Sequence, residues 1–108
     1  MSSKILNPED VKRKTLENIQ FELDWLQSKK KSILHSISKK INRIVNEGLK
    51  QEVEIYHSDI RQVRYGFEHL RVNVVLEEIA KWLEELGYKC QVSGWYHEKI
   101  TVSWSHVF

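Results

Sequence analysis

Three arginines stand among aromatic residues in the middle of this 108-residue chain, and their chemistry suits phosphate. The set comprises Arg61, Arg64, Arg71, Tyr56, Tyr65 and Phe67. Guanidinium groups bind phosphate through paired hydrogen bonds, and aromatic rings stack on nucleobases. The pattern predicts a site for a nucleotide-derived ligand, formed by Arg61, Arg64, Arg71 and Tyr65. The alternative is a charged loop whose arginines pair with neighbouring acidic residues, namely Glu52, Glu54, Asp59 and Glu68.

Basic residues dominate the first half of the chain and acidic residues the second. Residues 1–50 hold 11 Lys and Arg against 6 Asp and Glu, a balance of +5, whereas residues 51–108 hold 6 against 9, a balance of −3. The candidates for contact with nucleic-acid phosphates are Lys12, Arg13, Lys14, Lys29, Lys30, Lys31, Lys39, Lys40 and Arg43. Neutralised phosphates release counterions and give sequence-independent affinity. A solvated helix face, or head-to-tail contact between copies, explains the same charges.

Neither the histidines nor the single cysteine has a spacing typical of metal binding or catalysis. The histidines are His35, His57, His69, His97 and His106. Three of them, His57, His97 and His106, can meet across a predicted hairpin, but no two have ligand spacing on one helix. Cys90 alternates with apolar residues, which is typical of a buried side chain without an activating base. Nucleophile-elbow, phosphate-loop and zincin motifs are missing from the sequence. We expect no enzyme activity, no metal and no cofactor.

Apolar residues recur every three or four positions in the first half of the chain, as in the seam of a coiled coil. Phe21 and Trp25 lie four apart on one face, which overlaps the main stripe. A helix with this much apolar surface needs a partner. We expect self-association through Leu16, Ile19, Leu23, Trp25 and Leu26. Trp95 and Tyr96 stand beside a turn glycine, where large aromatics often mark a contact surface with another protein.

The seam requires a long helical segment. Asn7 and Pro8 are typical of a helix start, and Gly48 follows the last periodic residue as a helix-ending glycine would. One helix over residues 8–48 would be about 60 Å long, far more than a compact domain of this size. A break within residues 27–32 would instead give a kinked pair or an antiparallel pair. We favour one long helix or a kinked pair, with an arm over residues 1–36 and a domain over 37–108.

The second half predicts a small sheet with a crossover helix. Residues 52–56, 88–92 and 100–104 alternate polar and apolar side chains, which is the period of a half-buried strand. Residues 67–86 have the helical period, and Gly87 ends them. The order predicts an α+β fold in which the long helix or helix pair precedes a β-α-β-β unit with a three-stranded sheet.

Residues 37–105 resemble a type of small phage-encoded accessory protein. The resemblance rests on a helix that ends in Leu-Gly-Tyr-Lys, at residues 86–89, and on a hairpin that closes on Ile-Thr-Val-Ser-Trp, at residues 100–104. It implies a viral inhibitor of host defence, a regulator or a virion component, and it brings no catalytic residues. The sequence has no apolar run of membrane-spanning length and no signal-peptide pattern. We therefore expect a cytoplasmic protein, in the host cytoplasm if viral, that self-associates and binds a macromolecular partner.

Overall fold

The computed structural model describes residues 7–48, 50–64, 66–94 and 98–107. It contains helices α1 (Pro8–Ser28), α2 (Lys30–Glu47) and α3 (Val72–Glu85), and strands β1 (Glu52–Tyr56), β2 (Lys89–Ser93) and β3 (Lys99–Ser103). Single 3-10 turns follow β1 and β3, at His57–Asp59 and Ser105–Val107. Helices followed by a three-stranded antiparallel sheet confirm the predicted α+β class.

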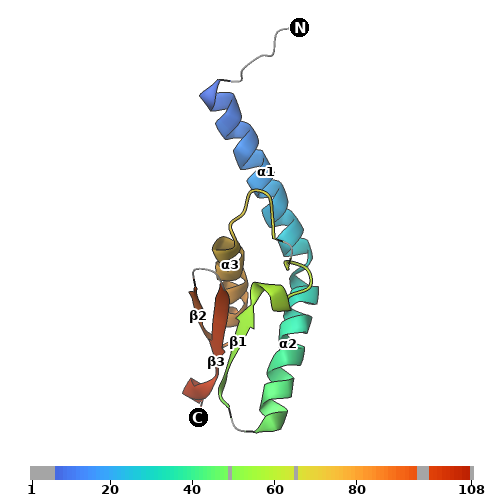
Figure 1. The fold of residues 1–108 in the computed structure, drawn as a ribbon, viewed down its shortest axis with the longest axis vertical. Coiled ribbons are helices and arrows are strands. Elements are labelled where there is room, and N and C mark those ends of the chain that lie inside the picture. The colour runs from blue at the N-terminus through green and yellow to red at the C-terminus, as the bar shows by residue number, and fades with distance from the viewer. Residues whose placement is uncertain (1–6, 49, 65, 95–97, 108) are drawn as a thin grey trace.

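Helices α1 and α2 run end to end, joined only at Lys29 (Figure 1). The start is as predicted, since the Asn7 side chain accepts a hydrogen bond of 2.9 Å from the Asp10 N–H. At the joint, the Lys29 N–H donates to the carbonyls of both Trp25 and Leu26, and the Lys29 carbonyl accepts from the Ile33 N–H at 2.9 Å. Because hydrogen bonding continues across the joint, the segment is a kinked pair. The antiparallel helix pair is wrong.

The sheet has the order β1-β3-β2, with both neighbours antiparallel to the central β3. Strand β1 covers the predicted residues, and Val53 pairs with Val102. Strand β2 starts one residue later than predicted. Its expected first residue, Tyr88, donates its N–H to the Leu83 carbonyl and so belongs to the end of α3. Gly87 makes this ending possible with a left-handed φ of 102°.

One core joins the helices to a single face of the sheet. Helix α3 contacts β2 and β3, and α2 contacts β1. The largest fully buried side chains are Leu26, Ile33, Ile37, Ile55, Ile60, Leu76, Ile79, Leu83, Ile100 and Val102. Ile33 and Ile37 belong to the same cluster, although the expected boundary between arm and domain falls between them at residue 36. The domain therefore takes in all of α2 and the end of α1.

The outer part of α1 projects beyond the rest of the molecule (Figure 1). It gives the chain an elongated shape, with extents of 66 × 26 × 22 Å. Helix α3 begins at Val72, five residues later than predicted, because residues 66–71 form a loop that lies against α1. That loop and α1 together line one open surface hollow.

Candidate interaction surface

The apolar stripe predicted from the sequence as a seam faces the chain's own core. Leu26 is only 1% exposed, and Ile19 and Leu23 are half-buried against the core cluster. Assigning Leu26 to an interface between chains is therefore wrong, because its side chain is already covered within one chain. Leu16 continues the same stripe beyond the domain, where it is 55% exposed.

Two aromatic side chains stay open on another flank of α1. Phe21 is 71% exposed and Trp25 is 37% exposed. Trp25 makes an edge-on contact with Phe67 of the loop before α3, with ring centroids 5.6 Å apart. The two rings and Phe21 border a shallow hollow of about 320 Å³, lined by Phe21, Glu22, Trp25, Gln62, Gly66, Phe67 and Glu68. We call this hollow the aromatic niche.

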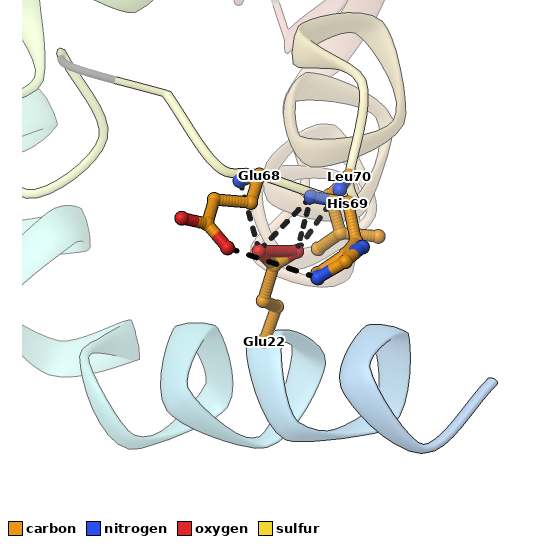
Figure 2. Close-up of polar contacts among 4 residues, drawn as sticks. All are labelled: Glu22, Glu68, His69 and Leu70. Carbon is orange, nitrogen blue, oxygen red and sulfur yellow. Dashed lines mark hydrogen bonds and ion pairs between the residues drawn. The ribbon is translucent and has the colours of Figure 1, made fainter. Parts of the chain in front are cut away.

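A carboxylate on α1 holds the loop that forms one wall of the niche. Glu22 accepts hydrogen bonds of 2.9 to 3.1 Å from three consecutive backbone N–H groups, those of Glu68, His69 and Leu70 (Figure 2). Consecutive N–H groups that point to one place form a natural cradle for an anion. In this protein the carboxylate of Glu22, a residue of the same chain, occupies that cradle. Glu22 thus fixes the loop against α1 and keeps Phe67 beside Trp25.

The exposed flank has the spacing of a coiled-coil face. Steps of three and four residues lead along α1 through Val11, Lys14, Asn18, Phe21 and Trp25, and all five are exposed. Such steps return to one side of a helix. We call these five residues the seam face. Of the residues expected at an interface, only Trp25 belongs to it. Phe21 also belongs to it: the sequence placed Phe21 on one face with Trp25 but did not include it among the expected interface residues, and the structure shows its side chain 71% exposed.

The arginines predicted to bind a nucleotide are spread along the loop between β1 and α3. Arg61 and Arg64 share the turn of residues 61–64, whereas Arg71 lies directly before α3. Tyr65 lies outside the described residues. Two of the acids expected to pair with them bind lysines instead, because Glu54 contacts Lys99 at 2.8 Å and Asp59 contacts Lys40 at 2.6 Å.

A cluster of basic side chains lies on α2. Lys39, Lys40 and Arg43 line an open hollow of about 390 Å³ with Ser36 and Asp59. Partial burial tends to raise the pKa of Asp59, but hydrogen bonds from the Lys40 side chain and the Tyr56 N–H outweigh it and lower that pKa overall. The ion pair neutralises part of the basic cluster and ties the turn after β1 to α2.

His106 and Cys90 both pack within the fold, whereas the buried Nδ1 of His57 has no hydrogen-bond partner within the described residues. His106 Nε2 lies 2.8 Å from the Gly87 carbonyl oxygen, so the end of the chain is tied to the end of α3. Burial and the nearby Glu84 carboxylate raise the pKa of the Cys90 thiol to about 11. Across the ranges that the structure describes, no three His, Cys, Asp or Glu side chains are placed to hold a metal ion. His97 lies outside those ranges.

Trp95 and Tyr96, the expected second contact surface, lie outside the described residues. None of the helices, as far as the structure describes them, is long and apolar enough to cross a membrane. Comparison with protein-family models, with curated proteins and with solved structures finds no match for the chain.

Proposed function

We propose that this protein is a non-enzymatic interaction protein that associates with itself through α1. The observation that carries the proposal is the exposure of apolar side chains on the projecting helix. Of the eight large hydrophobic residues that are exposed within the described ranges, four belong to α1, namely Val11, Leu16, Phe21 and Trp25. Covering a phenylalanine side chain in an interface is worth roughly 1.5–3 kcal/mol. A symmetric dimer would gain this twice at Phe21.

The experiment compares two matched variants with the parent by sedimentation velocity. Phe21→Ser removes the most exposed ring on α1, and its fold should persist because the side chain is 71% exposed. Val45→Ser is the control, since Val45 is an exposed apolar residue on α2. We expect the parent and Val45→Ser to sediment as an oligomer and Phe21→Ser to shift towards the monomer. Monomeric behaviour of all three proteins would contradict the proposal.

We also propose that the assembled protein binds a macromolecular partner. The support is the resemblance of residues 37–105 to small phage accessory proteins, together with the aromatic pair Trp95 and Tyr96. The test is retention of a host protein on the immobilised parent and on a Trp95→Ser, Tyr96→Ser double variant. A protein that the parent and Val45→Ser retain and the double variant loses would support the proposal. Equal retention by all three would contradict this use of the aromatic pair.

A further inference from the structure

We propose that the exposed side of α2 binds the phosphate backbone of duplex DNA. We call this side of the helix the basic face, and its residues are Lys31, Ser32, His35, Ser38, Lys39, Asn42, Arg43 and Asn46. All eight side chains are exposed. Binding through the basic face is independent of the proposed self-association, because it uses a different helix.

The basic face has cations but no acidic residue, and this follows from the sequence. Residues 25–46 hold six Lys and Arg and no Asp or Glu. The acidic residues of the second half of the chain stand on other elements, and four of them, Glu77, Glu78, Glu84 and Glu85, belong to α3. A surface whose charges have one sign attracts polymers of the opposite sign, and nucleic-acid phosphate is such a polymer.

The helical period gathers these residues on one side of α2. At about 100° per residue, the eight residues fall within an arc of about 140°. Ile33, Ile37 and Ile41 lie on the other side and are buried in the core. The core therefore holds the basic face in place before any ligand binds. From Lys31 to Asn46 the face is about 22 Å long, at a rise of 1.5 Å per residue.

Three cations on the basic face are available to phosphate. Lys31, Lys39 and Arg43 form no ion pair with another described residue. Lys30 and Lys40 lie outside the face, and they already pair with carboxylates of the chain at 3.8 and 2.6 Å. The fold thus neutralises the lysines beside the core and leaves the outward cations unpaired.

Two of these cations also share a hollow that can take a phosphate group. Lys39 and Arg43 line it together with the Ser36 hydroxyl. Asp59 lines the same hollow, but Lys40 binds its carboxylate. Guanidinium groups bind phosphate through two parallel hydrogen bonds, and lysine adds a point charge.

The chemistry of the basic face favours duplex DNA over other polyanions. Proteins that hold single strands stack the bases on aromatic rings, and the basic face has no Phe, Tyr or Trp. The major groove of DNA, about 12 Å wide, admits an α-helix, whereas that of an RNA duplex is too narrow for side chains to read. Because the apolar side of α2 is buried, the helix has no apolar surface to insert into a membrane.

The salt dependence of binding to a short DNA duplex of mixed sequence tests the proposal. The measurement is fluorescence anisotropy of the labelled duplex between about 50 and 200 mM salt. Each neutralised phosphate contributes about 0.9 to the slope of log K against log salt concentration, so three cations predict about −2.7 per bound chain. Lys39→Gln should weaken binding and make the slope shallower by about 0.9.

Lys81→Gln is the matched control, because it removes the same charge from an exposed position on α3. This control should keep the slope of the parent. The fold of both variants is checked by circular dichroism. Equal slopes for Lys39→Gln and Lys81→Gln, or a parent without affinity for the duplex, would overturn the proposal. Equal or tighter binding to an RNA duplex, a single strand or anionic lipid vesicles would overturn the assignment to duplex DNA.

A further variant separates this binding from self-association. Phe21→Ser, which should shift the protein towards the monomer, leaves the basic face unchanged. Adding Lys39→Gln to Phe21→Ser should therefore make the slope shallower by about 0.9 again. Loss of DNA binding with oligomers retained would overturn only the role of α2, whereas monomers that still bind DNA would overturn only the self-association.

Discussion

Replacing Glu22 with alanine should loosen the loop before α3 from α1. The Glu22 carboxylate is the shared acceptor for three backbone N–H groups, with distances of 2.9 to 3.1 Å. These bonds span 46 to 48 positions of the sequence, so they hold together two segments that are far apart along the chain. Without the carboxylate, the N–H groups must bind water, and Phe67 loses its support beside Trp25.

The magnitude follows from how exposed the three N–H groups are. A hydrogen bond to a charged acceptor contributes about 1.5–3 kcal/mol when its donor would otherwise be left unpaired. The bonds from Glu68 and His69 are exposed and can be replaced by water, whereas the bond from Leu70 is partly buried. We therefore expect Glu22→Ala to lower the free energy of unfolding by about 1–3 kcal/mol in total. A chain of this size loses about 4–8 °C in Tm per kcal/mol.

The assay is urea unfolding followed by circular dichroism, together with amide hydrogen exchange of residues 68–70. Glu22→Gln keeps one carbonyl acceptor and should lose about half as much. Glu17→Ala is the matched control, because Glu17 is exposed on the same helix and such changes stay within about 0.5 kcal/mol. If Glu22→Ala matched Glu17→Ala in both stability and exchange, the reasoning about the loop would be refuted.

Three further predictions concern the packing of the core, the loss of stability at acid pH and the reactivity of the Cys90 thiol. Ile79→Ala should cost about 2–5 kcal/mol in urea unfolding, because the Ile79 side chain is 0% exposed. The lowered pKa of Asp59 means that its carboxylate contributes stability above an unfolded pKa of about 3.9, which is lost as pH falls through the folded value. Asp59→Asn should remove that part of the pH dependence of the free energy of unfolding. If parent and variant lost stability equally as the pH was lowered, this role of Asp59 would be contradicted. With a pKa of about 11, Cys90 should react with a thiol reagent at pH 8 at least about a hundredfold more slowly when folded than in urea.

The elements of the fold could be predicted because their signals are local. The alternation in residues 52–56 indicated β1 with its correct bounds, and Asn7 with Pro8 marked the start of α1. The start of α3 was misplaced because the apolar period continues through Phe67. The contact that excludes residues 66–71 from the helix comes from Glu22, which is distant in the sequence. Local periodicity carries no information about such a partner.

The interface was harder to predict because a stripe of apolar residues does not say what covers it. Leu23 and Leu26 have the spacing of a seam, yet the chain's own domain buries Leu26 and half-buries Leu23. Glu22 had a detectable signal, since it is a carboxylate between Ile19 and Leu26 on the covered side of the helix. A charged residue in that position needs partners, and the backbone N–H groups of the loop provide them.

The most direct test of the account is the mass of the parent protein across a dilution series, measured by sedimentation equilibrium. Self-association through α1 predicts a mass near twice the chain mass of 12.9 kDa at high concentration, which falls towards 12.9 kDa on dilution. Phe21→Ser should shift this transition to higher concentration, because the exposed ring no longer contributes to the interface. A mass of 12.9 kDa at every concentration, for parent and variant alike, would contradict the central claim.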